Sequence, residues 1–248
     1  YEAYLYERGV KPNSVFVYLR TLKTLCNYAK KDGIVKESFN PFKEFSFAKF
    51  RSIKTKKRAI SKSEISKIAA LDLDPNSSLW NSRAYFLFSY YCRGINFIDI
   101  AFLKWSDIKD GRLIYTRKKT KELFNISLLD PALAILRYFE EMRNPDGSNY
   151  IFPILSKNNK TPKSMDNRIH KVLKATNKDL GSIGEMVGLN QKLTTYVARH
   201  SFATIMKKEG IPTAIISEAL GHDSEKTTQI YLESFENEII DNEVKSIL

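Results

Sequence analysis

The sequence predicts a mainly α-helical protein with a small β-sheet, of the α+β class. Residues 15–29 carry apolar side chains at spacings of three and four, the pattern of an amphipathic helix, and residues 194–208 have helical composition. Residues 112–116 and 123–128 are rich in β-forming side chains and flank a polar segment, which predicts two strands. With 248 residues, the chain is long enough for one large domain or two.

A domain boundary is expected near residue 48. The apolar stripe of the preceding helix consists of Val15, Tyr18, Leu19, Leu22, Leu25, Cys26 and Ala29. Residues 49–58 are dense in positive charge and poor in large apolar side chains, which predicts an exposed linker. The basic residues singled out in it are Arg51, Lys54, Lys56, Lys57 and Arg58. Such a linker is suited to a nucleic-acid backbone, although a merely soluble linker would have the same composition.

Short local signals place the later helices. Ser61 and Glu64 have the spacing of a capping box, which marks the first helix of a new domain. Gly210 is a stop signal just past residues 194–208. Pro212 then opens a short apolar helix, and Gly221 ends it. The residue after Gly221 is therefore expected at an exposed helix end.

Composition narrows the classes of function. The net charge of +12 and the pI near 9.5 indicate a polyanionic partner and favour nucleic acid. Cys26 and Cys92 form neither a disulfide framework nor a C-x-x-C motif, and no metal-ligand spacing is present, so neither metal nor cofactor is expected. The sequence has no bilayer-spanning run and no signal peptide, which predicts a cytoplasmic protein without membrane contact. Because residue 1 is Tyr1 and not methionine, the chain is expected to be a fragment.

The last quarter of the chain is the most informative. Tyr196, Arg199 and His200 lie three and four residues apart, so they share one helix face. The triplet L-G-H ends at His222, and Tyr231 lies nine positions later. Each of these residues alone is more often a surface or packing residue. As a set in a basic chain they predict phosphoryl transfer on DNA, with a guanidinium fork on the phosphate and a tyrosine nucleophile.

These motifs resemble the tyrosine recombinase (phage integrase) family, whose second motif reads H-x-x-R-H-[ST]-F-A-T and whose tyrosine follows L-G-H by nine residues. The Y-V-A-R-H segment resembles integrases of conjugative transposons. The resemblance covers about 40 residues here and implies that Tyr231 forms a 3′-phosphotyrosyl link, assisted by Arg199 and His222. It implies a supporting role for His200. Tyr196 replaces the family's histidine; a phenol can donate to a phosphoryl oxygen but is a poor proton acceptor.

The family's first motif resembles residues 90–108. Aligned on the acidic position, Asp99, it puts Asn96 where the first arginine is expected, and Arg93 lies one helical turn earlier. Since a guanidinium stem can span the roughly 5.4 Å of one turn, the first-arginine role is assigned to Arg93. Asn96, or a plain helix-terminal role for Arg93, is the alternative. Asp99 is expected to be a buried support that orients an arginine or caps a backbone group, because a carboxylate would repel the phosphate.

In the family, a lysine of the β-hairpin protonates the departing 5′-oxygen. The resemblance assigns that role to Lys119, with Lys118 and Lys121 in the same turn as alternatives and as candidate DNA contacts. A basic turn that is merely solvated is the other interpretation. Arg117 is a poor acid, because a guanidinium hardly gives up its proton.

The resemblance also implies the domain organisation and the partners. Residues 1–48 would be the C-terminal part of a helical core-binding (SAM-like) domain, residues 49–58 a basic linker, and residues 59–248 the tyrosine recombinase catalytic domain. The implied partner is double-stranded DNA, bound by a homotetramer that exchanges C-terminal segments, with accessory DNA-bending proteins. The implied reaction is integration or excision of a mobile element in the bacterial cytoplasm, at the nucleoid, without metal or nucleotide.

Two other functions remain open. Asn96 and Tyr196 stand at two signature positions and also suit a DNA-binding module that has lost catalysis. A type IB topoisomerase shares the tyrosine chemistry and would relax supercoiled DNA without paired sites. A covalent protein–DNA adduct that depends on Tyr231 would exclude the first alternative.

Overall fold

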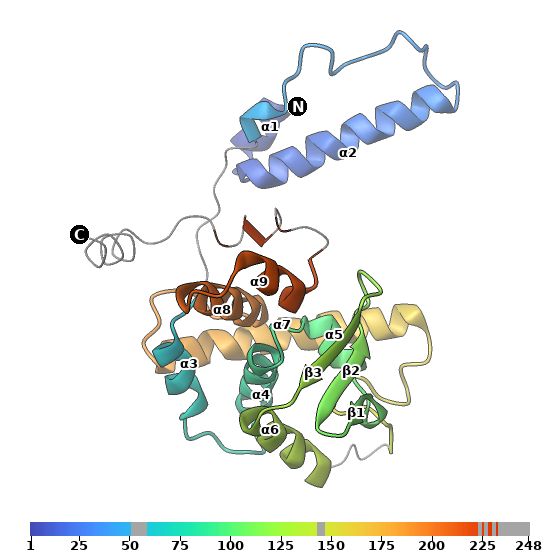
Figure 1. Ribbon diagram of the computed structural model, residues 1–248. Helices are drawn as coiled ribbons and strands as arrows, with labels where there is room; N and C mark the ends of the chain where they lie inside the picture. Colours follow the sequence, from blue (N-terminus) through green and yellow to red (C-terminus); the bar gives the residue numbers. More distant parts are fainter. Residues whose placement is uncertain (51–58, 143–146, 223–224, 226–227, 230–231, 233–248) are drawn as a thin grey trace, which may run out of the picture. The chain divides into compact units, whose positions relative to one another are not determined.

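The computed structural model describes residues 1–50, 59–142, 147–222, 225, 228–229 and 232 (Figure 1). The chain divides into two compact units, Tyr1–Lys57 and Arg58–Leu248, and each has its own buried apolar cluster. Residues 51–58, the larger part of the predicted linker, lie outside the described residues.

The described part of the first unit is helical. It contains α1 (Glu2–Glu7), α2 (Pro12–Lys31) and the short 3-10 helix η1 (Ala48–Phe50). Its buried residues are Leu5, Val15, Leu19 and Phe50. The predicted amphipathic helix is confirmed, but its stripe is covered only near the start, because Leu25 is 58% exposed. An apolar stripe identifies one face of a helix; it does not tell how much of that face a neighbour covers.

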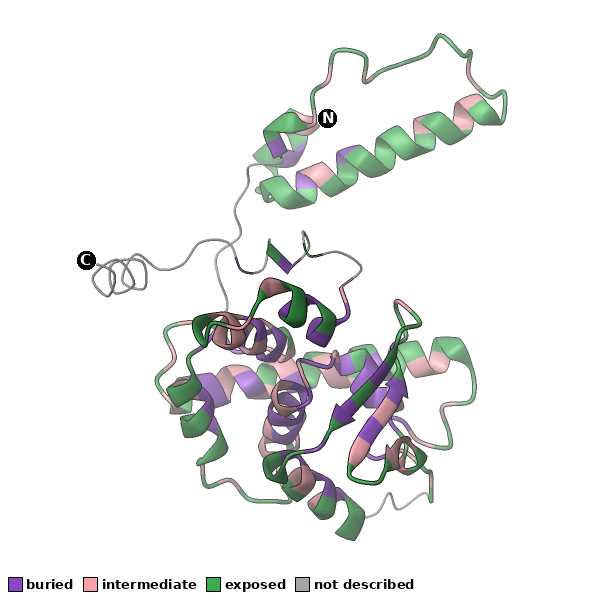
Figure 2. Cartoon of the chain, in the orientation of Figure 1, coloured by how far each residue is buried: buried purple, intermediate pink, exposed green. Residues whose placement is uncertain are grey.

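The helix α4 (Ser78–Tyr91) is the centre of the second unit. It packs against α6 (Asp130–Glu141), α7 (Pro162–Met186) and α8 (Thr195–Lys208) (Figure 1). Figure 2 shows that α4 is buried or half-buried along most of its length, from Leu79 to Tyr91. A helix that is apolar on most sides fits such a central place.

The predicted capping box is present at α3 (Lys62–Ala69). The Ser61 hydroxyl accepts from the Glu64 backbone N–H, and the Glu64 carboxylate accepts from the Ser61 N–H. Two N–H groups that a helix start leaves unpaired are thereby satisfied, which stabilises the start of α3.

The predicted strands pair in a three-stranded antiparallel sheet with the order β1-β2-β3. Its strands are β1 (Ile108–Lys109), β2 (Arg112–Thr116) and β3 (Leu123–Ser127), so the last strand ends one residue earlier than predicted. Two cross-strand pairs form the buried face of the hairpin: Leu113 with Ile126, and Tyr115 with Phe124. They share a face because alternate residues of a strand point to the same side of the sheet.

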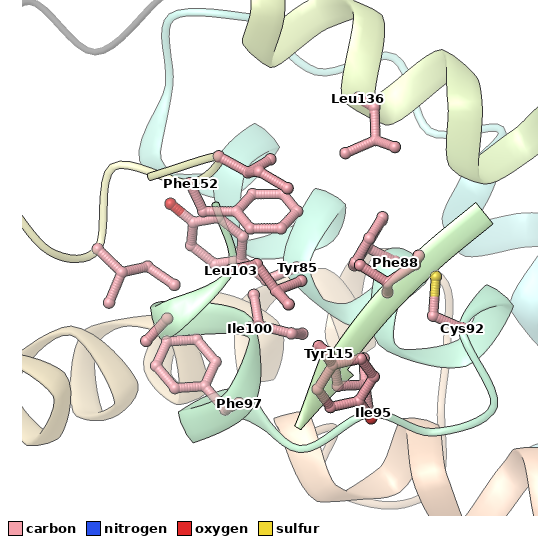
Figure 3. Close-up of a cluster of buried hydrophobic side chains, with 14 of the residues drawn as sticks. Tyr85, Phe88, Cys92, Ile95, Phe97, Ile100, Leu103, Tyr115, Leu136 and Phe152 are labelled. Carbon is pink, nitrogen blue, oxygen red and sulfur yellow. The ribbon is translucent and has the colours of Figure 1, made fainter. Parts of the chain in front are cut away.

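The largest apolar cluster joins β2 to α4 and to α5 (Phe97–Phe102) (Figure 3). Some of its aromatic rings pack edge to face, as in Phe88 with Phe152, whose centroids lie 5.0 Å apart, and others stack, as in Tyr115 with Phe124. Tyr115 of β2 and Phe97 of α5 belong to the same cluster. The core therefore holds the turn between α4 and α5 close to the end of β2.

The two C-terminal helices are confirmed. α8 has Thr194 as its N-cap, and α9 (Thr213–Leu220) begins after Pro212. α9 ends at Gly221, whose φ of 60° is left-handed, and a Cβ there would lie 2.3 Å from the Phe124 ring. Only glycine fits this conformation and this close approach to β3, so Gly221 fixes the direction in which the chain leaves α9.

In the described ranges, none of the helices has the length and apolar content that a bilayer crossing requires. The same ranges contain no group of three or more histidine, cysteine or acidic side chains arranged to hold a metal ion.

Candidate active site

A cavity of about 780 Å³ collects residues from the ends of several elements of the second unit. Its lining consists of Ile95, Asn96, Phe97, Ile98, Arg117, Lys119, Thr120, Leu173, Asn177, Thr194, Thr195, Tyr196, Arg199, Gly221 and His222. Five predicted site residues are therefore brought together: Asn96, Lys119, Tyr196, Arg199 and His222. A larger cavity of about 1060 Å³ along α7 is lined by His170 but by none of these five predicted site residues. The smaller cavity is the candidate active site.

Backbone carbonyls hold Arg199 in the cavity. The side chain is 4% exposed; its Nη1 donates to the Gly94 oxygen at 3.0 Å, and its Nη2 donates to the Leu220 oxygen. A Cβ on Gly94 would lie 2.9 Å from the Cα of Arg199, so a glycine is needed where α8 crosses this turn. No carboxylate in the described part of the chain lies within ion-pair distance of this guanidinium. Arg199 is a fixed positive charge without an anionic partner there.

His222 is oriented from both sides of its ring. Nε2 lies 3.1 Å from Nη2 of Arg199, and Nδ1 lies 2.7 Å from the hydroxyl of the fully buried Thr228. A guanidinium only donates, so in this arrangement Nε2 accepts and the proton is on Nδ1, which donates to Thr228. Arg199 and Thr228 together fix the orientation of the imidazole, with Nε2 directed at the arginine.

Asp99 lies behind the cavity and is 3% exposed. One carboxylate oxygen accepts from the Lys118 backbone N–H at 2.9 Å, and the Asn96 side chain also hydrogen-bonds the carboxylate. Asp99 thus caps the turn of the hairpin from the first turn of α5, as a buried support does. Burial raises the pKa of this carboxyl above its usual range, while the hydrogen bond from Lys118 and the charge of Arg117 act in the opposite direction.

The three lysines of the hairpin turn point to different places. Lys119 is exposed and lines the cavity. The Lys118 ammonium lies 3.8 Å from the centroid of the Phe102 ring, a cation–π contact outside the cavity lining. Lys121 is exposed, with a left-handed φ of 60°. Lys119 is therefore the lysine of this turn that can reach a group bound in the cavity.

Tyr196 and His200 pack against each other on the same face of α8, as predicted. Their rings meet edge to face, with centroids 4.7 Å apart and an interplanar angle of 88°. Tyr196 is 41% exposed and lines the cavity, whereas the half-buried His200 does not. The hydroxyl of Tyr196 is accordingly the group that a bound phosphate can meet.

Arg93 is not among the residues that line the cavity. It is half-buried just past α4 and has a left-handed φ of 57°, followed by Gly94 at 71°. Two successive left-handed residues end α4 sharply and send the chain into α5. Asn96, the other candidate for the first-arginine role, does line the cavity.

Arg117 is a candidate functional residue that the sequence prediction considered only as a poor acid. It is 7% exposed and lines the cavity next to Lys119. Strand alternation could have indicated its direction, because Arg117 follows the inward-facing Leu113 and Tyr115 at intervals of two. Burial, and after it the charge of Arg117, lowers the pKa of Arg199 to about 10. Arg199 still carries its charge at neutral pH.

Several predicted residues lie outside the described ranges. They are Tyr231 and the linker residues Arg51, Lys54, Lys56, Lys57 and Arg58. Near Tyr231 in the sequence, Thr228 and Leu232 are described and buried, and the Lys207 ammonium donates to the Leu232 oxygen.

The chain matches two families of known proteins. Residues 58–238 match the phage integrase family, and residues 1–51 match the phage integrase SAM-like domain. Among curated proteins, it is similar to the tyrosine recombinase XerA of Pyrococcus furiosus, with 28% identity over 234 residues, 92% of this chain and 72% of that protein.

Solved structures share the fold. One is a lambda integrase fragment, solved as a dimer bound to a COC′ core site. The superposition covers 95% of this chain and 79% of the lambda integrase chain, with a TM-score of 0.66 and 18% identity. Another is the Tn1549 transposon integrase, in complex with circular intermediate DNA. The superposition covers 98% of this chain and 82% of the Tn1549 integrase chain, with a TM-score of 0.62 and 14% identity.

Proposed function

The chain belongs to the phage integrase family and is a tyrosine-type site-specific DNA recombinase, and we propose that it breaks and rejoins DNA strands through a covalent link between Tyr231 and a 3′-phosphate. The observation that carries the residue assignment is the cavity in which Lys119, Arg199 and His222 meet. These are three of the cationic or hydrogen-bonding groups that a phosphoryl transfer needs around one phosphate.

The proposed cleavage exchanges one bond for another. The phenolic oxygen of Tyr231 gives its proton to solvent water and bonds to the scissile phosphorus, while the bond from phosphorus to the 5′-oxygen breaks. The ammonium of Lys119 gives a proton to the departing 5′-oxygen. Rejoining is the reverse reaction with a new 5′-hydroxyl. Since a phosphodiester is exchanged for a phosphotyrosyl ester and back, the reaction needs no nucleotide.

The remaining groups act on charge. Arg199 donates to the non-bridging oxygens, which carry added negative charge in the pentavalent phosphorane. His222 adds a hydrogen bond to the same group when its Nε2 takes up a proton and donates in place of its contact with Arg199. The hydroxyl of Tyr196 donates one more. The resemblance to the family assigns the first-arginine role to Arg93, with Asn96 as the alternative.

We further propose how the chain meets DNA. Residues 1–48 act as the C-terminal part of a core-binding domain, and the basic linker and residues 59–248 follow the duplex. Lys118 and Lys121 contact phosphates from the hairpin turn. The active assembly is a homotetramer that exchanges C-terminal segments, aided by DNA-bending proteins, and it integrates or excises a mobile element at the bacterial nucleoid. The net charge of +12 supports such a partner.

A covalent trap tests the function. The full chain is mixed with nicked duplexes whose sequence is randomised around the nick, so that cleavage releases a short strand that diffuses away. Denatured protein should carry attached DNA, and sequencing that DNA should reveal a preferred site. Tyr231→Phe removes only the hydroxyl, so it should bind the selected duplex normally and form no adduct.

The same trap, together with a plasmid-relaxation assay, distinguishes the proposed function from its two alternatives. A wild-type chain that binds duplex DNA but forms no adduct would be a decayed binding module. A chain that relaxes supercoiled plasmid without a selected site would be a topoisomerase. Neither alternative is favoured by the relatives, which are named tyrosine recombinases.

A further inference from the structure

A second guanidinium lies in the cavity beside that of Arg199. Arg117 directly follows β2 and continues its alternation, so its side chain points to the buried side while Lys118 and Lys119 are exposed. The hairpin turn fixes its backbone: its N–H donates to Glu122 at 2.9 Å, and its oxygen accepts from Lys121 at 3.0 Å. An arginine that is 93% buried at a cavity wall has a defined direction and cannot simply extend into water.

The two arginines meet at one place. Nη1 of Arg117 donates to the Gly221 oxygen at 2.5 Å and lies 3.4 Å from the Leu220 oxygen. Nη2 of Arg199 also donates to the Leu220 oxygen. The backbone of the L-G-H triplet thus brings both guanidiniums to the point where His222 enters the cavity.

Among the described residues, this pair of arginines has no ion-paired anion. Nε of Arg117 is buried and has no hydrogen-bond partner among the described residues. In the same part of the chain, neither guanidinium forms an ion pair. Two carboxylates lie nearby without ion-pairing to them: Asp99 accepts from the Lys118 backbone, and Oε2 of Glu122 lies beside Gly221. Two like charges held together in a buried place are unfavourable unless a negative group joins them. A phosphate, with two non-bridging oxygens, has the charge and the acceptors that this arrangement leaves unmet.

Arg93 and Asn96 do not supply this charge. Arg93 lies outside the cavity lining, in the left-handed turn that ends α4. Asn96 is neutral, occupies the N-cap position of α5 without a side-chain capping bond, and hydrogen-bonds Asp99. The position of the first motif is therefore filled by a residue that supports the hairpin turn and not by a cation.

We propose that Arg117, from the end of β2, is the first phosphate-binding arginine of this recombinase. The inference rests on the proposed function. When the scissile phosphate enters, Nε and one Nη of Arg117 donate to one non-bridging oxygen and Arg199 donates to the other. The two carbonyls of Leu220 and Gly221 hold the guanidiniums in place before DNA binds. Arg117 makes no covalent bond; it stabilises the charge of the phosphorane.

Single-turnover cleavage of the duplex selected in the covalent trap tests this role. Arg117→Ala should lower the cleavage rate by about 10² to 10³, the typical loss when one such donor is removed, while the Kd for DNA changes by only a few fold. Arg93→Ala should lose less than about tenfold. Arg112→Ala, at the start of β2 and outside the cavity lining, is the matched control and should cleave at the wild-type rate.

A neutral phosphate analogue separates charge stabilisation from a structural role. A methylphosphonate at the scissile position removes one negative charge, so it needs one guanidinium less. The deficit of Arg117→Ala should shrink to less than about tenfold on one methylphosphonate diastereomer, and that of Arg199→Ala on the other. Arg117→Lys keeps the buried charge without the fork; should the alanine variant fail to fold, the lysine variant must show the same deficit and the same rescue.

The outcomes are distinct. The inference is wrong if Arg117→Ala cleaves the phosphate at the wild-type rate. It is also wrong if Arg117→Ala and Arg117→Lys stay equally impaired on both diastereomers, because Arg117 then only holds the hairpin in place. If Arg93→Ala alone shows the loss and the rescue, the first arginine is Arg93. Absence of a Tyr231-dependent adduct with the wild-type chain would instead refute the proposed function itself.

Discussion

The cavity combines two regions that carry positive charge in different ways. On the α8–α9 side, Arg199 is 4% exposed, and the carbonyls of Gly94 and Leu220 hold its guanidinium. In the β2–β3 turn, Lys119 is exposed at the cavity wall. A fixed guanidinium meets developing charge without reorganising, whereas an ammonium on a mobile stem can approach an oxygen and give up a proton. In the proposed mechanism, this difference in burial assigns charge stabilisation to Arg199 and proton transfer to Lys119.

The largest expected effect comes from making the fixed side mobile. Arg199→Lys keeps a cation but loses the planar fork and at least one of its two carbonyl contacts. Single-turnover cleavage should fall by about 10³, with DNA affinity nearly unchanged. Arg112→Lys, an equal change on the outer part of β2, should have no such effect. If Arg199→Lys lowers the cleavage rate by less than about tenfold, the fixed position of the guanidinium is not what this region contributes to cleavage.

A large but conditional effect is expected at the mobile side. Lys119→Ala should cleave ordinary DNA about 10² times more slowly, because the 5′-oxygen then leaves without its proton. Replacing that bridging oxygen with sulfur provides a leaving group that needs no proton, so the variant should recover to within about tenfold of wild type. Arg199→Lys should not recover on the same substrate.

Lys118→Ala is the matched control for this turn, since its ammonium lies over the Phe102 ring. With the DNA fully bound, Lys118→Ala should cleave both substrates at the wild-type rate. If sulfur rescues Lys118→Ala or Lys121→Ala and not Lys119→Ala, the rescued position is the general acid. Rescue of none of the three would leave His222 or Tyr196 as the source of the proton.

A smaller effect is expected where the fixed region is held from behind. Thr228→Val keeps the volume of the side chain but removes the hydroxyl that pairs with Nδ1 of His222. One lost hydrogen bond should slow cleavage by about tenfold. In His222→Ala the same change at Thr228 should add nothing, because the two residues act through one contact. Additive losses in the double variant would mean that Thr228 acts elsewhere.

The smallest effect is expected from the exposed cations of the turn. Lys121→Ala should weaken DNA binding by a few fold and lower the slope of log Kd against log salt concentration by about one, as the loss of one phosphate contact does. Cleavage of bound DNA should keep its rate. An unchanged slope would show that Lys121 is a solvated side chain of the turn and not a DNA contact.

Much of the fold could be predicted because its signals are local. The Ser61–Glu64 capping box, the stop at Gly221 and the alternation in β2 each depend on a few neighbouring residues, and each is present in the structure. The stripe of α2 was predicted as a face, but its cover was not, since Leu25 is 58% exposed. Burial of that face depends on which other segments pack against it. The periodicity along one helix carries no information about those segments.

The sequence by itself determined the family, the helix that carries Arg199 and the hairpin that carries Lys119, because motif spacing and strand patterns are properties of short segments. Only the tertiary structure decided which other cation reaches the cavity. Arg93 is closer in sequence to the expected position, yet two left-handed residues turn the chain there. Arg117 enters because β2 packs on α4 and α5 and because Gly221 admits the ring of Phe124. Such contacts join residues about a hundred positions apart, and no local pattern records them.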